Sequence, residues 1–255
     1  MAPRSHIEWT QSTWNPTTGC TKVSPGCQHC YAERMALRLR AMGQYKYRNG
    51  FELTLHEWAL DAPLSWKRPQ VIFVDSMSDL FHSHVPSDFV GQVFSTMERA
   101  HWHTFQVLTK RSKALLYGSL LRKCPPNVWL GVTVENASCA DRINDLRNAY
   151  GPDTMRFLSC EPLLGDLPNI DLRSINWVIC GGESQPGCRP MNLDWARTLR
   201  DACVRQGVPF FLKQLGGYPN KRHNEKALLD GKLWRQMPSA ATQRAIDRKD
   251  KLAFL

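Results

Sequence analysis

Three cysteines near the amino terminus have the residue type and the spacing of a metal-binding loop. Cys20, Cys27 and Cys30 lie within eleven residues, separated by six residues and then by two. Three thiolates from one loop can occupy three corners of a tetrahedral metal site or of an iron–sulfur cubane. The chain has no second Cys-x-x-Cys to complete a four-cysteine zinc site. The spacing favours a [4Fe-4S] cluster with one open iron; the alternatives are zinc, with His29 or a distant residue as fourth ligand, and no metal.

Polar residues follow six predicted strands at the points where those strands end. The expected strands cover 71–74, 105–108, 128–134, 155–158, 177–180 and 209–212, after a first strand at 7–10. Helices are expected over 31–41, 87–100, 112–121, 137–149 and 192–206. Strands that alternate with helices at this spacing indicate βα units and a parallel sheet. The carboxyl ends of parallel strands meet at one edge, so the polar tips should converge there; they are 75–79, 109–111, 135–136, 159–161, 181–184 and 213–214.

Six polar tips favour a barrel over an open doubly wound sheet, which usually gathers its ligand at one crevice. No Gly-x-Gly-x-x-Gly follows the first strands, and its absence argues against a dinucleotide-binding fold. We predict an α/β fold, a partial or closed (β/α) TIM-like barrel with its site at the C-terminal ends of the strands. The barrel is expected to span 1–217, with the cysteine loop at 13–33, and a basic C-terminal extension to span 218–255.

Composition and charge narrow the class of protein further. With 255 residues, 42% hydrophobic and 22% charged, the chain resembles a globular domain rather than a disordered tail or a membrane bundle. No apolar run approaches the roughly 20 residues of a spanning helix, and the first 14 residues lack the apolar stretch of a secretory signal. We therefore expect a cytoplasmic protein without disulfides. Its 33 Lys and Arg against 23 Asp and Glu favour a nucleic-acid partner, although many basic proteins bind none.

Motifs along nearly the whole chain resemble those of a known family. The matching stretches are 13–20, 27–33, 75–81, 108–111, 131–136, 159–163, 181–184 and 211–214. They are similar to the phage-associated three-Cys-motif proteins, a family of largely unassigned function that resembles a branch of the radical S-adenosylmethionine (radical SAM) enzymes. The usual radical SAM loop has three residues between its first two cysteines, whereas this chain has six.

The resemblance implies a cofactor and a chemistry. Cys20, Cys27 and Cys30 would bind three irons of a [4Fe-4S] cluster, and the amine and carboxylate of S-adenosylmethionine would chelate the fourth. The reduced cluster would split the sulfonium, releasing a 5′-deoxyadenosyl radical that abstracts hydrogen from the substrate. An electron donor must then be a partner. His29 occupies the position of an aromatic residue beside the adenine, with an exposed loop histidine as the alternative.

Further cofactor contacts are implied at the first two strand tips. Ser76, Ser78 and Asp79 offer acceptors to the methionyl ammonium, or else they cap the following helix. Lys110 or Arg111 would pair with the methionyl carboxylate, or else be a solvated surface charge. At the next tip Glu135 and Asn136 would bind the ribose hydroxyls, although Asn136 can instead start the next helix.

The later tips are expected to face the substrate. Glu161 and Glu183 are candidates for hydrogen bonding or proton transfer, or else structural partners of Arg156 or Arg189. Cys160 is a candidate hydrogen-atom donor, with a buried structural thiol as the alternative.

Small and polar residues complete the predicted substrate site. Gly181 and Gly182 let the backbone approach a ligand closely and could cradle a phosphate. Ser184, which follows them, is also a candidate substrate contact. Lys213 and Gln214 are candidates to bind a phosphate or the edge of a base.

The resulting expectation is a radical SAM enzyme that modifies or rearranges a base in DNA or in a modified nucleotide. The concrete version is the isomerisation of a hypermodified thymidine in a phage pathway, in the host cytoplasm. One alternative is a radical DNA-repair lyase. The other is a non-catalytic nucleic-acid-binding protein that zinc or a cluster stabilises.

Overall fold

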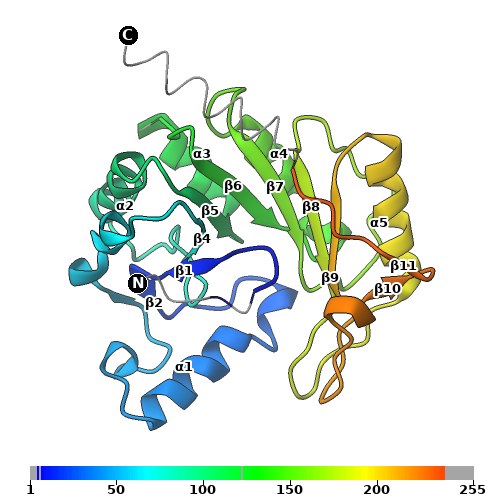
Figure 1. The fold of residues 1–255 in the computed structure, drawn as a ribbon, viewed down its shortest axis with the longest axis horizontal. Coiled ribbons are helices and arrows are strands. Elements are labelled where there is room, and N and C mark those ends of the chain that lie inside the picture. The colour runs from blue at the N-terminus through cyan, green and yellow to red at the C-terminus, as the bar shows by residue number, and fades with distance from the viewer. Residues whose placement is uncertain (1–4, 6, 122, 239–255) are drawn as a thin grey trace.

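Seven parallel strands form the central sheet of the protein (Figure 1). The computed structural model describes residue 5, residues 7–121 and residues 123–238. The strands follow one another in chain order across the sheet: β1 (Ser12–Trp14), β4 (Val71–Val74), β5 (Thr104–Thr109), β6 (Val128–Thr133), β7 (Met155–Cys160), β8 (Trp177–Gly181) and β9 (Phe210–Gln214). Two small antiparallel pairs are β2 (Thr17–Thr18) with β3 (Thr54–Leu55), and β10 (Leu228–Leu229) with β11 (Lys232–Leu233).

Five α-helices connect these strands among the described residues: α1 (Tyr31–Ala41), α2 (Ser87–Arg99), α3 (Ser112–Leu121), α4 (Asp141–Asn148) and α5 (Leu193–Arg205). Short 3₁₀ turns are η1 (Pro25–Cys27), η2 (Tyr45–Tyr47), η3 (Glu57–Ala59), η4 (Ala62–Ser65), η5 (Ala137–Cys139) and η6 (Asn224–Lys226). The predicted helices are confirmed, except that 137–149 divides into η5 and α4. The first strand predicted at 7–10 is wrong, because Thr10 N–H bonds back to Ile7 in a turn and β1 starts at Ser12.

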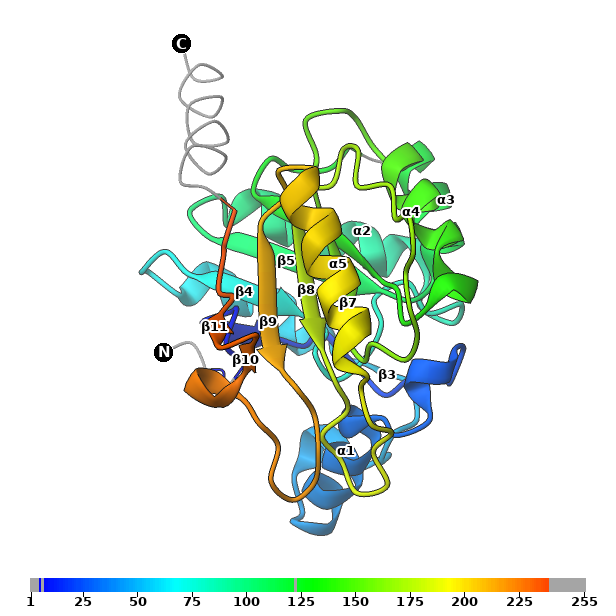
Figure 2. The same ribbon diagram turned by 90° about the vertical axis from the view of Figure 1, so that its right-hand side faces the viewer.

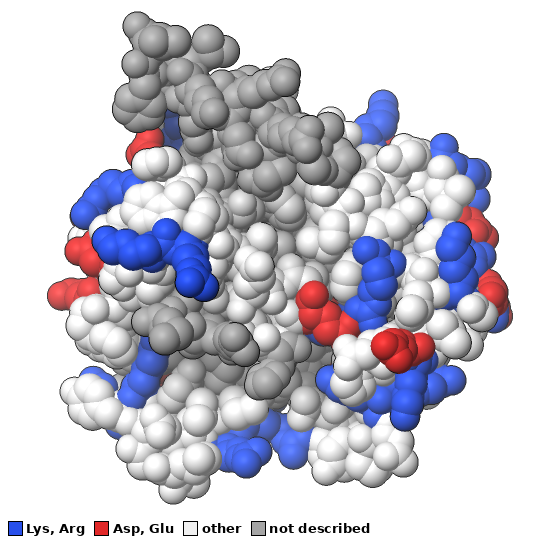
Figure 3. All heavy atoms as spheres, viewed as in Figure 1, with Lys and Arg blue, Asp and Glu red and all other residues white. Residues whose placement is uncertain are grey.

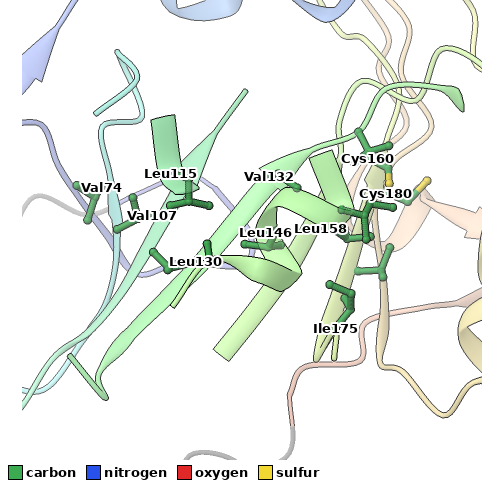
Figure 4. Packing of buried hydrophobic residues seen from close by; sticks show 14 of the residues in the cluster. Val74, Val107, Leu115, Leu130, Val132, Leu146, Leu158, Cys160, Ile175 and Cys180 are labelled. Carbon is green, nitrogen blue, oxygen red and sulfur yellow. The ribbon is translucent and has the colours of Figure 1, made fainter. Parts of the chain in front are cut away.

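The helix-facing side of the sheet holds the larger hydrophobic core. Its strand residues pack against α2, α3, α4 and α5, which cover this side in both ribbon views (Figures 1 and 2). Figure 4 shows side chains from the middle strands in this layer, among them Leu130, Leu158 and Cys180. The strands β6, β7 and β8 are buried at every position and are mostly apolar, as expected for parallel strands that are buried on both faces.

The inner side of the sheet holds a second, mostly aromatic cluster. Its buried members are Trp9, Phe73, Trp129, Met155, Phe157, Trp177, Ile179 and Phe211. The Trp9 ring centroid lies 4.8 Å from that of Phe73 and 6.3 Å from that of Trp177. Trp9 therefore joins β4 to β8 across the inside of the curled sheet. Because these side chains fill the inside of the curled sheet, a binding site can form only at the carboxyl ends of the strands.

The barrel is partial, because β1 and β9 stand at opposite ends of the strand order. The free edge of β9 is hydrogen-bonded by the chain segment 234–236, with Leu212 N–H donating to Trp234 O at 2.8 Å. Arg235 of this segment forms an ion pair with Glu8, which precedes β1. The two ends of the described chain thus meet at the open seam. Only the part of the predicted extension up to residue 238 lies within the described residues.

Gly131→Ala is expected to destabilise the protein through overpacking of the inner face. Gly131 stands beside Phe157 in the β6–β7 register, and an added Cβ would lie 2.5 Å from the Phe157 ring. Overpacking of this kind costs about 1–3 kcal/mol. Denaturant unfolding should show this loss for Gly131→Ala and little change for Gly151→Ala, where nothing lies within 4 Å of the added Cβ. Equal stabilities would contradict the tight inner packing.

Candidate functional site

The cysteine loop lies at the carboxyl ends of the strands. In Figure 2 the arrowheads of β8 and β9 point toward α1, which begins directly after Cys30. Cys20 follows β2, and Cys27 ends the η1 turn. The loop enters through Gly19, whose φ is +83° and whose added Cβ would lie only 2.1 Å from the carbonyl oxygen of Glu52. Only glycine fits this close crossing.

Arg111 holds the first part of the loop from the tip of β5. Its guanidinium donates to Asp79 Oδ2 at 2.9 Å, to the Cys20 sulfur at 3.4 Å and to Thr21 O at 3.0 Å. Asp79 also accepts a hydrogen bond from Thr109 at 2.7 Å. Both charged side chains are nearly buried. The two residues predicted to contact the cofactor therefore use their polar atoms to fix Cys20.

Glu135 holds the middle of the loop from the end of β6. Its fully buried carboxylate accepts a short hydrogen bond from Ser24 and a 2.8 Å ion-pair contact from Arg142. A Cβ on Gly26 would lie 2.6 Å from Glu135 Oε1, so the loop rests directly on this carboxylate. Burial raises the pKa of Glu135, but Lys110, Ser24 and Arg142 outweigh burial and leave the pKa lowered.

A third anchor comes from the segment after β8. Arg189 binds the Glu183 carboxylate through its backbone N–H at 2.8 Å and through its guanidinium, and it donates to Pro25 O at 2.9 Å. Burial raises the pKa of Glu183, but its bonds with Arg189 outweigh burial and leave the pKa lowered. His29 lies against the same segment, 3.3 Å from where a Gly187 Cβ would stand. The segment from β8 therefore closes onto the cysteine loop.

The serines of the β4 tip also serve the loop. Ser78 Oγ donates to Gly19 O at 2.6 Å, directly before Cys20. Ser76 Oγ donates to Asn15 Oδ1 at 3.1 Å, and the same oxygen accepts from Met77 N–H at 3.1 Å. Neither serine hydroxyl caps α2, so the capping alternative is wrong for both.

The three thiols have different electrostatic surroundings. Burial raises the pKa of Cys20, assisted by Asp79 and opposed by Arg111. Burial also disfavours the Cys27 thiolate, but hydrogen bonds from Val23 and Ser24 and the charge of Lys110 outweigh burial and lower its pKa. All three cysteines are half-buried and unpaired. The surroundings thus favour the thiolate, the form that binds metal, at Cys27 and disfavour it at Cys20.

The donor set of the loop consists of three thiols, the ligand type that iron–sulfur clusters use. Within the described ranges, no three His, Cys, Asp or Glu side chains are grouped so that they could hold a single metal ion. The three thiols stand on one loop, which is held at Cys20 by Arg111, at Ser24 by Glu135 and at Pro25 by Arg189. A cluster bridges ligands through several metal atoms, so it does not need three sulfurs gathered around one point.

A second group of charges lies on the later strands. Lys213 Nζ of β9 is 2.8 Å from Glu161 Oε2, which follows β7. An added Cβ on Gly181 of β8 would lie 3.1 Å from the same oxygen, so glycine leaves room for this pair. Gln214 donates to Gly182 O at 2.6 Å and holds the backbone there. The structure thus brings together Glu161, Gly181 and Lys213.

Three predicted residues lie outside these groups. Cys160 is fully buried in the helix-facing core with Cys180 and Cys203, and burial raises its pKa well above the usual value. Asn136 caps η5, accepting from Ser138 N–H at 3.0 Å, as its alternative predicted. Ser184 is half-buried beside Glu183. The structure does not bring Cys160 to the site.

Asp75 was not predicted as unusual, yet it is a buried carboxyl at the tip of β4. Its φ is 55°, its Oδ1 accepts from Thr17 N–H at 3.0 Å, and among the described side chains its buried Oδ2 has no hydrogen-bond partner. Burial raises its pKa to about 7. A turn-forming Asp directly after an apolar strand is the only sequence signal for this position.

The Asp75→Asn variant should therefore change how stability depends on pH. The folded pKa of about 7 exceeds the ordinary 3.8, so ionisation costs the folded state stability as pH rises from about 4 to 7. The wild type should lose on the order of 3–4 kcal/mol relative to Asp75→Asn over this range. Unfolding free energies of both proteins between pH 4 and pH 8 measure this difference. A constant difference would contradict the buried, neutral carboxyl.

A family model described as "Protein of unknown function (DUF5131)" matches residues 4–238. No curated protein matches the chain significantly. Two similar solved structures are spore photoproduct lyase complexed with dinucleoside spore photoproduct (TM-score 0.46, 10% identity) and a double mutant of that lyase with S-adenosylmethionine and the dinucleoside bound (TM-score 0.44, 9% identity). Each alignment covers 88% of this chain, which spans only 65% of the neighbouring chain.

Proposed function

This chain belongs to the DUF5131 family, whose function is unassigned, and we propose that it is a radical SAM enzyme that acts on a base in DNA. One observation carries the proposal. Side chains from the tips of β5 and β6, and from the segment between β8 and α5, hold a loop of three cysteines over the open end of a partial barrel. Such convergence on one loop is what a cofactor-bearing loop requires, because its ligands must be fixed while one side stays open for a second molecule.

The residues divide into two roles in this proposal. Cys20, Cys27 and Cys30 hold a [4Fe-4S] cluster, which with S-adenosylmethionine supplies one-electron cleavage of the sulfonium and hydrogen abstraction from the substrate. Arg111 and Glu135 act as positioning residues for the loop rather than as contacts to the nucleoside. This replaces the ribose role expected for Glu135, since its two oxygens already bind Ser24 and Arg142.

Lys110 is the cation that we propose for the methionyl carboxylate. Its ammonium lies 3.3 Å from Thr133 Oγ1, and its charge lowers the pKa of both Cys27 and Glu135. No ion pair within 4.0 Å involves Lys110 among the residues with described positions. It therefore offers an unused charge beside Cys27. His29, at the rim of the loop, stays our proposal for the adenine contact.

The Glu161–Lys213 pair is the proposed substrate contact. It is mostly buried, with side-chain exposures of 12% and 23%, and it borders Gly181, which has no side chain to crowd the pair. A carboxylate and an ammonium side by side can bind the donor and acceptor atoms of a base edge, or a phosphate. The net charge of +10 supports nucleic acid as the polymer that carries this base.

The reaction that we propose to test first is the rearrangement of a hypermodified thymidine in a phage pathway. An isomerisation returns the abstracted hydrogen, so that substrate and product have the same composition and no net oxidant is used. A lyase that acts on a DNA lesion uses the same site and is the second outcome of the test.

Anaerobic reconstitution tests the proposal. The protein loaded with iron and sulfide should contain one [4Fe-4S] cluster per chain and, after reduction with dithionite, should form 5′-deoxyadenosine from S-adenosylmethionine. Mass spectrometry of nucleosides from DNA made with and without the protein then identifies the product. Stoichiometric zinc without cleavage would leave a nucleic-acid-binding protein and overturn the enzyme.

A further inference from the structure

Basic and aromatic side chains gather on α1 and the turn that follows it. Between residues 31 and 48 the chain has five Lys and Arg residues and one acidic residue, Glu33. Glu33 is neutralised by Lys22 at 3.0 Å. On the face of the molecule shown in Figure 3, Lys and Arg side chains mark the lower margin, where α1 lies in Figure 1. The segment is therefore strongly cationic.

The arginines of this segment differ from those elsewhere on the surface. Arg197 and Arg200 of α5 both pair with Asp230, at 2.9 and 2.5 Å. By contrast, no ion pair between described residues involves the exposed Arg38 or Arg48. If the basic residues of α1 only faced solvent, we would expect carboxylates beside them, as Asp230 lies beside the arginines of α5. Unbalanced charge of this kind attracts a polyanion.

The α1 stripe, defined as Tyr31, Arg34, Met35, Arg38 and Met42, runs along one side of the helix. Its members recur at helical spacing, opposite the buried Ala32 and Ala36, and all of them are exposed. Beyond the helix, Tyr45 is 70% exposed, and Trp58 is 67% exposed. The Arg48 guanidinium lies 4.3 Å from the Tyr45 ring centroid, and Lys46 Nζ lies 5.2 Å from that of Trp58. Exposed rings beside cations are the arrangement on which bases stack.

The stripe begins at the mouth of the barrel. Tyr31 donates a hydrogen bond to Ser76 O at the β4 tip, and Arg34 donates to Gln185 of the segment after β8 at 2.8 Å. From there α1 extends outward for 11 residues, which is about 16 Å. At a spacing of about 3.4 Å per nucleotide this length corresponds to about five nucleotides.

We propose that α1, η2 and Trp58 form a track for a nucleic-acid strand that delivers one base to the barrel mouth. The substrate is then a polynucleotide and not a free nucleotide. This inference rests on the proposed function and adds to it the form of the substrate. Phosphates meet the arginines, and bases stack on Tyr45 and Trp58.

Oligonucleotide binding by the full chain tests the track, measured by fluorescence anisotropy without S-adenosylmethionine or reductant. Fluorescein-labelled oligothymidylates of two and eight nucleotides are the probes. The eight-nucleotide probe should bind at least about tenfold more tightly, because only it covers the stripe. Arg38→Ala/Arg48→Ala should lower the slope of log affinity against log salt by about 1.4, the value for two single-strand phosphate contacts. Tyr45→Ala should weaken binding at least about fivefold.

Matched variants away from the mouth provide the controls. Arg68→Ala/Arg205→Ala removes the same charge from exposed positions before β4 and at the end of α5. Tyr117→Ala removes a ring on α3 that is 71% exposed, as Tyr45 is 70% exposed. Both controls should bind like the wild type. The track would be overturned if the α1 variants bound the eight-nucleotide probe as tightly as the wild type does. It would also be overturned if the wild type bound both probe lengths with equal affinity.

Three further outcomes test this inference, and the last two separate it from the proposed function. Polyglutamate and unlabelled oligonucleotide are compared as competitors of the labelled probe at equal concentrations of negative charge. If polyglutamate displaces the probe equally well, the surface binds acidic protein and the inference fails. If 5′-deoxyadenosine forms but the α1 variants bind DNA normally, the enzyme stands and the track fails. If no S-adenosylmethionine is cleaved although the α1 variants lose DNA binding, the enzyme fails and the nucleic-acid surface stands.

Discussion

Cys27→Ser should abolish both cluster loading and S-adenosylmethionine cleavage, with 5′-deoxyadenosine formation falling at least about a thousandfold. Cys27 is the loop thiol whose pKa is lowered, through Val23, Ser24 and Lys110 against the effect of burial. A serine hydroxyl stays protonated at neutral pH and is a poor iron ligand. Iron content and the visible absorption of the reconstituted protein measure the first loss, and product formation measures the second.

The matched control is Cys124→Ser, another half-buried thiol, which lies before β6 and outside the loop. It should keep the iron and the activity of the wild type. Circular dichroism and thermal unfolding should show that Cys27→Ser is folded, since Cys27 is not part of the buried core. A Cys27→Ser protein that still carries a complete cluster would remove the basis of the proposed function.

Glu135→Gln should lower the free energy of unfolding by about 3 kcal/mol, because removing one partner of a buried ion pair leaves the other charge unpaired. The carboxylate is fully buried, and its partner Arg142 is 13% exposed. The Ser24 hydroxyl, which binds Glu135, also lies 3.7 Å from the Cys27 sulfur. Loss of this anchor should therefore raise the alkylation rate of Cys27 several-fold, measured by mass spectrometry of labelled peptides.

The pH dependence provides a second readout for Glu135. Its folded pKa lies below the ordinary 4.5, so its stabilising contribution is complete above about pH 4.5 and is lost as pH falls through the folded pKa. The difference between the wild type and Glu135→Gln should shrink below about pH 4. Asp61→Asn, which breaks an exposed pair with Arg99, should stay near the wild type throughout. A Glu135→Gln protein with unchanged stability and unchanged Cys27 alkylation would contradict the anchoring role.

The sheet was predictable because apolar runs and turn residues are local signals. The strand at 71–74 was predicted to the residue, and the others to within a residue or two at each end. The first strand was missed because Ser12–Trp14 is short and partly polar. Its position depends on parallel pairing with Ile72–Val74, sixty residues later in the chain, and such pairing leaves no local pattern.

The site was predictable as a location but not in its contacts. Parallel strands bring their carboxyl ends together, so the polar tips had to converge. Which atoms meet depends on long-range packing: Ser24 and Glu135 are 111 residues apart, and Arg111 and Thr21 are 90 apart. Arg111 and Glu135, which were predicted to contact the cofactor, consequently bond to residues of the cysteine loop.

Side-chain direction was the other missing information. Cys160 and Glu161 are adjacent, yet one packs against α5 residues and the other pairs with Lys213. In a strand buried on both faces, apolar residues occur at every position, so no alternation shows which residue points inward. Phe157 and Ile179 lie in the inner cluster. Only the folded sheet therefore shows which residues of β7 and β8 point inward and which point toward the helices.

The segment 234–236 that bonds to β9 has a consequence for shortened versions of the protein. A chain cut after residue 217, where the sequence alone suggests that the barrel ends, would leave the backbone groups of Phe210 and Leu212 without their partners. Bare strand edges act as templates for another copy of the same strand. Such a fragment should self-associate in a concentration-dependent way, which means that the segment 234–236 protects the protein against polymerisation through β9.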